Sequence, residues 1–383
     1  MKIIGEKLRK ARIIRGYSIT ELAKECGISK QAISQYENED CEPKDDVLLT
    51  LSSILRFPIR FFTCAVNEQL EVRNTFFRSK MSANNLDKTS WAERAKIVSN
   101  FYLLLNEYLE LPNYNLPEIS QTLIENKDYE TISKKVRNYW GIKENPIPNM
   151  VNLLEENGIV VSTMKNYADN LSIDAFTQTY RKSNVYCIIL EDIKNSMARR
   201  NFSLAHELGH IILHKDVNFD EMTNEEKREK ENEADKFASC FLLPCESFQN
   251  DLRNINPCKI KDYIPLKEKW CVSIGAMILR AREICNINNV WFQRLIKAYS
   301  YYHYRTNEPL DDQLPMKKPS LFTQALEILL ENKIFTPNTL IDKFEEKGYP
   351  LYLKDFTDFF SLDQNFFDKY ENNAQVIKLK KIL

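Results

Sequence analysis

The chain has 383 residues, which is enough for two or three domains, and its formal net charge of −1 indicates no class of partner by itself. Its nine cysteines are scattered, odd in number and without paired metal-ligand spacing, so we expect a cytoplasmic protein and not a disulfide framework. The first residues carry charges without an apolar run behind them, and no stretch is long and apolar enough to span a bilayer, so we expect neither a signal peptide nor a membrane partner.

Residues 1–66 are predicted to form a small helical bundle. Residues 1–36 hold eight Lys and Arg against three Glu, so this part of the chain is locally basic. Ser18 and Ser29 are suited to begin two short helices, and Glu21 completes a capping box with Ser18. Gly27 lies between the helices, where a left-handed backbone is needed. Two short helices joined by a glycine turn are typical of the helix-turn-helix motif.

The second helix of this motif is predicted to contact DNA bases, because it enters the major groove with its N-terminal residues toward the bases. Glutamine can pair bidentately with adenine, and lysine can donate to guanine. The predicted base-contacting residues are Lys30, Gln31, Ser34 and Gln35. Basic residues of the first helix are expected near phosphates: Arg9, Lys10, Arg12 and Arg15. The alternative interpretation is an ordinary bundle with a solvated polar face.

This segment resembles the Xre/Cro-type repressor family. The resemblance rests on Leu22-Ala23, Gly27-Ile28-Ser29, residues 33–38 and Pro43. Glu39-Asp40 stands where that family often has glycine, and we expect this difference to affect a turn and not the groove contact. Double-stranded operator DNA is therefore the expected partner.

Residues 67–120 are predicted to be a helical connector. Apolar residues recur at helical spacing from residue 91 to residue 111, and Pro112 ends the predicted helix. Two further helices are predicted within residues 120–157, with a break at Trp140-Gly141 and Pro146-Ile147-Pro148.

Three strands are predicted next, at residues 158–162, 174–177 and 185–190, because these segments are rich in β-branched and aromatic residues. They form a small sheet that precedes more helices, which is an α+β order. The chain has only eight glycines and abundant Leu, Ile, Lys, Glu and Asn. The predicted fold class is therefore mainly α with a small sheet.

The segment His206-Glu207-Leu208-Gly209-His210 uses two of the four histidines of the chain. Residues four apart lie on one face of a helix, so the two imidazoles can bind one Zn²⁺. Glu207 then lies beside the metal, where it can take a proton from a water molecule. By itself the motif also fits an ordinary amphipathic helix that carries two histidines.

A second apolar helix is predicted around residues 231–243, and it offers the missing ligand. Catalytic zinc usually has three protein ligands and one open position. Glu231 and Asp235 are four residues apart and share one face. We interpret Glu231 as the third ligand, and Asp235 as the carboxylate that holds a ligand imidazole by its other N–H. Glu233 is rotated away from this face and is the weaker candidate.

His214 is the rival third ligand. On a straight helix it would point roughly 80° away from the direction of His206, at 3.6 residues per turn. One helix also cannot easily place three ligands around a tetrahedral ion. We therefore interpret His214 as a packed or capping histidine at the end of the helix.

The remaining residues carry weaker signals. A second helix-turn-helix is conceivable at residues 262–285, although its mixed charge favours a structural role. His303 or a tyrosine of the run at residues 301–304 could supply an oxyanion donor, with simple packing as the favoured interpretation. Residues 301–383 are predicted to be a C-terminal helical module of unknown role.

From about residue 70 to about residue 300, the order of motifs resembles the ImmA/IrrE metallopeptidase family. The matching residues are Phe76-Phe77-Arg78, Trp140 with Pro146-Ile147, Glu155 with Gly158-Ile159, Asp174-Ala175-Phe176, residues 200–210 and residues 231–244. The resemblance implies a zincin-like core at residues 121–300. It also implies zinc ligands at His206, His210 and Glu231, a general base at Glu207, and repressor proteins as substrates.

Two classes of function fit this sequence. In the first, a DNA-binding regulator carries a zinc-dependent endopeptidase that cleaves a regulatory protein, with Glu207 as the general base. In the second, a DNA-binding repressor or antitoxin uses its metal domain as a sensor or as a scaffold for a partner such as a toxin. A homodimer on a palindromic operator would favour the second class. Both fit a toxin–antitoxin, mobile-element or phage-defence operon, and manganese or iron could replace zinc.

Overall fold

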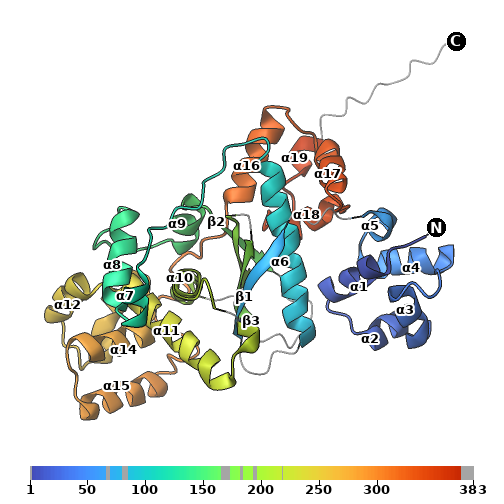
Figure 1. The fold of residues 1–383 in the computed structure, drawn as a ribbon. Coiled ribbons are helices and arrows are strands. Elements are labelled where there is room, and N and C mark those ends of the chain that lie inside the picture. Colours follow the sequence, from blue (N-terminus) through green and yellow to red (C-terminus); the bar gives the residue numbers. More distant parts are fainter. Residues whose placement is uncertain are drawn as a thin grey trace.

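The computed structural model describes residues 2–65, 70–79, 85–164, 173–181, 184–192, 196–217 and 219–371. Within these residues the fold is mainly helical with one four-stranded sheet, so the predicted fold class is confirmed. The N-terminal bundle lies beyond α6 (Asn85–Leu105), on the opposite side of the sheet from α10 (Met197–Leu213) (Figure 1). Among the described residues, no helix has both the length and the apolar character that crossing a bilayer requires.

Five helices form the N-terminal bundle: α1 (Gly5–Ile14), α2 (Ile19–Glu25), α3 (Lys30–Glu37), α4 (Asp45–Leu55) and α5 (Ile59–Thr63). The predicted capping box is present, because Ser18 Oγ accepts from the Glu21 N–H at 3.2 Å and the Glu21 carboxylate accepts from the Ser18 N–H at 2.8 Å. Gly27 has a φ of +66° and makes the predicted left-handed turn. Ser29 caps α3 by accepting from the Ala32 N–H.

The sheet has the strand order β1-β3-β4-β2. Its strands are β1 (Glu71–Ser79), β2 (Ile159–Met164), β3 (Ile173–Arg181) and β4 (Tyr186–Glu191). β3 is antiparallel to both β1 and β4, whereas β2 is parallel to β4. The three predicted strands are present, and β1 is a fourth that the sequence pattern did not reveal. β1 lies within the segment predicted to be a helical connector, so that segment contributes a strand as well as α6.

The two faces of the sheet belong to two hydrophobic cores. Phe176 of β3 faces α6 and packs edge-on against Trp91, whereas its neighbour Ala175 faces α10. This alternation follows from the two-residue period of a strand. The α6 core continues into the N-terminal bundle and the helices of residues 321–371, and the α10 core contains the helices that surround α10.

The helices on the α10 side surround that second core. They are α7 (Gln121–Glu125), α8 (Tyr129–Tyr139), α9 (Met150–Glu156), α11 (Asn224–Leu242), α12 (Cys245–Arg253), α13 (Ile264–Trp270), α14 (Ile274–Ile284) and α15 (Asn289–Tyr301), with short 3₁₀ turns at Phe219–Glu221 and Ile260–Tyr263. α13 and α14 lie within residues 262–285, where the sequence made a second helix-turn-helix conceivable. Trp270 and Ile274 are buried on either side of the turn between them.

A C-terminal module joins the bundle to the sheet. Its helices are α16 (Leu321–Glu331), α17 (Pro337–Glu346), α18 (Leu353–Phe359) and α19 (Asp368–Glu371). Arg15 of α1 forms a buried ion pair with Asp355 of α18 at 2.8 Å. Ser162 of β2 donates to the carbonyl of Phe359 at 2.9 Å. The module therefore contacts the N-terminal bundle and one edge of the sheet through buried polar groups.

α6 is shorter at its C-terminal end than the sequence pattern predicts. It ends at Leu105, and residues 106–109 continue as tight turns instead of reaching residue 111. The N–H groups of Glu107 and Tyr108 bond to the carbonyls of Leu104 and Leu105, three residues back, at 3.1 Å and 3.0 Å. Such i→i+3 bonds tighten the end of a helix.

Candidate functional site

The geometry of the site depends on a close approach of α10 and α11. α10 begins at Ser196, whose Oγ accepts from the Arg199 N–H at 3.3 Å. Gly209 faces α11, and a Cβ at this position would lie 3.1 Å from the Phe237 ring and 3.2 Å from the backbone of Ala234. The absence of a side chain at Gly209 lets the two backbones approach, so that residues of α11 can reach the histidines of α10.

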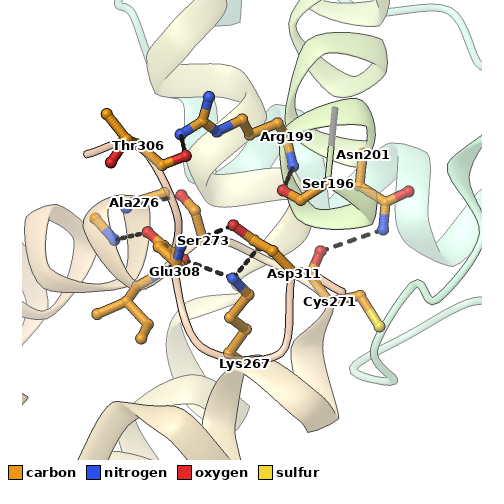
Figure 2. A network of polar contacts seen from close by, with 12 residues as sticks. Ser196, Arg199, Asn201, Lys267, Cys271, Ser273, Ala276, Thr306, Glu308 and Asp311 are labelled. Atoms are coloured by element: carbon orange, nitrogen blue, oxygen red, sulfur yellow. Dashed lines mark hydrogen bonds and ion pairs between the residues drawn. The ribbon is translucent and has the colours of Figure 1, made fainter. Parts of the chain in front are cut away.

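Polar contacts fix the N-terminal half of α10 (Figure 2). Asn201 donates to a carbonyl of the turn between α13 and α14 at 3.2 Å. Arg199 donates to the Arg305 carbonyl at 2.7 Å. The segment after Arg305 is anchored by Glu308, whose carboxylate accepts a hydrogen bond from buried Lys267 at 2.8 Å. The contact of Asn201 is buried, whereas that of Arg199 is exposed, and together they join α10 to the turn after α13 and to the segment around Arg305.

Three predicted ligands come together where α10 meets α11. The Nε2 atoms of His206 and His210 are 3.0 Å apart, and the Glu231 carboxylate lies 3.2 Å from the first and 3.3 Å from the second. A tetrahedral zinc ion with bonds of about 2.0–2.1 Å would separate its ligand atoms by about 3.3 Å. The donor set and its spacing therefore fit one zinc ion.

The charge states of these groups also suit a metal. Burial lowers the pKa of His210 to about 3, so its imidazole is neutral at pH 7 and has a lone pair to offer. Burial alone would raise the pKa of Glu231, but the imidazoles of His206 and His210, which face its carboxylate, outweigh burial and hold the pKa well below its usual value. A neutral imidazole and an ionised carboxylate are the forms that coordinate metals.

Asp235 lies where the sequence predicts a supporting carboxylate. Its Oδ1 is 2.7 Å from Nδ1 of His206, on the side of the ring opposite to Glu231. An ionised carboxylate can only accept, so Nδ1 carries the proton and Nε2 is left with its lone pair. The contact thus orients the ring and selects its tautomer.

Glu207 is buried beside the two histidines, and its neighbour on the sheet was not predicted. Thr177 of β3 donates its hydroxyl to the Glu207 carboxylate. Phe76, opposite Thr177 on β1, stacks on the His210 ring with centroids 5.1 Å apart. The sheet therefore holds both the carboxylate and one imidazole. The one sequence signal for the Thr177 contact was that residue 177 belongs to a strand predicted at residues 174–177.

His214 and Glu233 form a second contact with the histidine pair. His214 is the C-cap residue of α10 and is buried. Its Nδ1 lies 2.9 Å from Nδ1 of His210, and its Nε2 lies 3.0 Å from Glu233 Oε2. The structure therefore places His214 behind His210, and Glu233 points to His214 and not to the cluster formed with Glu231.

The aromatic run at residues 301–304 makes other contacts. Tyr304 is buried and packs edge-on against Tyr299. The centroid of the Tyr302 ring lies 5.3 Å from the ammonium group of Lys261. Tyr301 and His303 are exposed. These contacts support the packing interpretation of the run.

The predicted DNA-contacting residues lie along α3. Lys30, Gln31 and Gln35 are exposed, Ser34 is half-buried, and Ile33 is buried on the opposite face of the helix. α1 lies between α6 and the other helices of the bundle, so the polar face of α3 is not covered by the body of the protein (Figure 1). This arrangement is compatible with insertion of α3 into a major groove.

Two of the residues expected near phosphates have structural partners instead, so that expectation is wrong for them. Arg12 is buried and forms a two-bond ion pair with Glu37, the second bond being 2.9 Å long. Arg15 is buried and donates to the Leu55 carbonyl and to Asp355. The spacing of basic residues in α1 could not reveal which of them face inward. Arg9 is exposed, and Lys10 is half-buried beside Glu6.

Comparisons with known proteins identify two domains. A comparison with curated proteins found no match. Among solved structures, the chain is similar to a Mycobacterium tuberculosis transcriptional regulator, with 16% sequence identity and a TM-score of 0.31 over 42% of this chain. That match covers 58% of the other chain, which is less than two thirds of its length. Residues 8–62 match the helix-turn-helix family model, and residues 154–282 match that of the IrrE N-terminal-like domain.

The second matched segment contains the histidine pair, Glu207, Glu231 and Asp235, and the first contains all of α3. Both resemblances seen in the sequence are thereby confirmed. Residues 8–62 are thus similar to helix-turn-helix domains, and residues 154–282 are similar to IrrE N-terminal-like domains.

Proposed function

We propose that this protein is a DNA-binding regulator of transcription carrying a zinc-dependent endopeptidase that cleaves a regulatory, repressor-like protein. The observation that carries the proposal is the convergence of His206, His210 and Glu231 beside the buried carboxylate of Glu207. Two imidazoles, one carboxylate ligand and an adjacent general base are the parts that metal-assisted peptide hydrolysis needs.

The DNA-binding part of the proposal rests on α3. The helix-turn-helix match supports DNA binding, and the exposed polar face of α3 supports base contacts by Lys30, Gln31, Ser34 and Gln35. A glutamine pair at this place would favour adenine, and the lysine would favour guanine. The partner is then an operator in double-stranded DNA, bound by one copy of the chain or by a homodimer.

His206, His210 and Glu231 would hold the zinc ion, and Asp235 would orient His206. When bound, zinc lowers the pKa of a water molecule toward neutrality and polarises a peptide carbonyl. Glu207 would accept the proton of the attacking water and then pass it to the leaving amine. Thr177 holds the Glu207 carboxylate by one hydrogen bond, which limits its rotation between these two transfers.

The sheet offers a place for an extended substrate. β1 is an edge strand, and its residue Phe76 stacks on His210, so this edge is adjacent to the proposed metal centre. An extended peptide can add to such an edge through main-chain hydrogen bonds, while pockets between side chains give specificity. A flexible segment of a repressor protein would meet this requirement.

The test combines metal content with cleavage, using purified wild type and Glu207→Gln and the proteins encoded beside this one as candidate substrates. We expect one zinc ion per chain in both proteins, and cleavage by the wild type alone, because glutamine cannot accept the proton. Cleavage by Glu207→Gln would refute the mechanism. Zinc without cleavage of any candidate would favour the alternative, a repressor or antitoxin whose metal domain senses or binds a partner.

A further inference from the structure

A chain of buried contacts leads away from the proposed metal centre through His214. Nδ1 of His210 is 2.9 Å from Nδ1 of His214, and Nε2 of His214 is 3.0 Å from Glu233. The Glu233 carboxylate is in turn held by Lys230 at 3.0 Å and by Lys127 at 3.3 Å. All three members of the chain from His210 to Glu233 are buried.

The donors and acceptors along this chain can be arranged in only one consistent way when both imidazoles are neutral. Glu233 lies beside two ammonium groups and is an acceptor, so Nε2 of His214 carries a proton. The Nδ1 atom of His214 then has a lone pair and accepts from Nδ1–H of His210. His210 is therefore left with a lone pair on Nε2, the atom that lies 3.3 Å from Glu231.

We propose that His214, anchored by Glu233, is a positioning residue that fixes the tautomer and ring orientation of His210 toward the metal; this inference rests on the zinc site proposed above. Each ligand imidazole then has its own support, Asp235 for His206 and the His214–Glu233 pair for His210. The same geometry argues against His214 as a ligand, because both of its ring nitrogens already face other partners.

The inference assigns a role to a residue that spacing alone left without one. Any buried histidine needs partners for its ring nitrogens, but here the partner of Nδ1 is itself a proposed metal ligand, and the partner of Nε2 is a carboxylate. Partners that orient metal ligands typically change metal affinity by roughly 10- to 100-fold when they are removed. The effect of changing His214 is therefore predicted to appear first in zinc affinity.

The test compares two substitutions of His214 in the full chain. His214→Leu removes the acceptor that faces His210, whereas the side-chain oxygen of His214→Asn can occupy the place of Nδ1 and keep it. Zinc affinity is measured by competition with a chromophoric chelator, and the absorption spectrum of the Co²⁺-loaded protein reports the geometry of the ligands. His303→Asn, at the exposed histidine outside the cluster, is the matched control.

We expect His214→Leu to weaken zinc binding by roughly 10- to 100-fold and to alter the Co²⁺ spectrum, with His214→Asn closer to the wild type and His303→Asn unchanged. Glu233→Ala removes the anchor while leaving His214 in place, and it is the second variant if His214→Leu does not fold. If the variants lacking these contacts kept the zinc affinity and the Co²⁺ spectrum of the wild type, this inference would be wrong but the proposed function would stand. Absence of zinc binding by the wild type would overturn the proposed function as well.

Discussion

The hydroxyl of Thr177 is the side-chain group that the structure adds to the proposed catalytic machinery. It donates to Glu207 from the neighbouring strand, where no metal-binding motif would direct attention. A hydrogen bond to a charged group contributes about 1.5–3 kcal/mol. Most of that contribution is expected to act on the orientation of the carboxylate, because both groups are buried.

We predict that Thr177→Val slows cleavage by roughly tenfold to a hundredfold while zinc content stays the same. Valine keeps the shape of threonine but cannot donate, so the Glu207 carboxylate would lose its fixed direction. The measurement is the rate of substrate cleavage at saturating zinc. Thr177→Ser keeps the hydroxyl and is the control, and equal rates for Thr177→Val and the wild type would contradict the proposed support.

Residue types and spacing predicted much of the candidate site. The His-Glu-x-x-His pattern, with Glu231 and Asp235 four residues apart, selected the side chains that the structure brings together. The contact between His214 and Glu233 could not be predicted, because it depends on where α11 crosses the end of α10 and not on the period of either helix. The inward direction of Arg12 and Arg15 depends on tertiary packing in the same way.

At the level of elements, the close contact of α10 and α11 determines the distance between the ligands. Gly209 has no Cβ at the point where α10 faces the backbone of Ala234. Glycine in the interior of a helix costs up to about 1 kcal/mol relative to alanine. Glycine occupies position 209, where a side chain would push α10 and α11 apart.

We predict that Gly209→Ala weakens zinc binding by roughly tenfold, with little change in the stability of the zinc-free protein. The added Cβ would meet the α11 backbone at 3.2 Å and move Glu231 away from the histidines, while the gain in helix propensity of about 1 kcal/mol offsets the strain. Zinc titration and thermal unfolding in chelator measure the two effects. Gly209→Val should act more strongly, and unchanged zinc affinity in both variants would refute the argument.

The unpredicted strand β1 shows the limit of pattern recognition for elements. From Glu71 to Thr75 its residues are mostly polar, without the apolar alternation that marks a half-buried strand. Asn74 explains part of this, because its amide donates to the Lys215 carbonyl beyond the end of α10. A strand whose inner face meets backbone carbonyls needs polar side chains there, so its sequence resembles a loop.

At the level of the whole molecule, the N-terminal bundle is attached to the rest of the chain through buried polar contacts. Arg15 and Asp355 are 340 positions apart in the sequence and form an ion pair in which both side chains are buried. The sequence predicted the two matched domains, yet it could not predict this attachment. Neither residue belongs to a motif, and complementary charges occur throughout the chain.

We predict that Asp355→Ala lowers the free energy of unfolding by about 3 kcal/mol, because it leaves the Arg15 guanidinium buried without its carboxylate. The value lies at the lower end for a broken buried pair, since Arg15 still donates to the carbonyls of Leu55 and Arg56. Chemical denaturation followed by circular dichroism measures the change. The double variant Arg15→Met with Asp355→Leu should recover much of the loss, and a single variant as stable as the wild type would contradict the prediction.

Successive side chains of β3 point to opposite faces of the sheet, so this strand should not tolerate insertion or deletion of a single residue during evolution. Phe176 belongs to the core shared with the N-terminal bundle, and the adjacent Thr177 contacts Glu207 on the other face. Insertion or deletion of one residue before this pair would exchange their faces, placing a benzyl group against Glu207 and a hydroxyl in the larger core. Homologous chains should therefore vary here by substitution, and insertions or deletions should be confined to the segments before and after the strand.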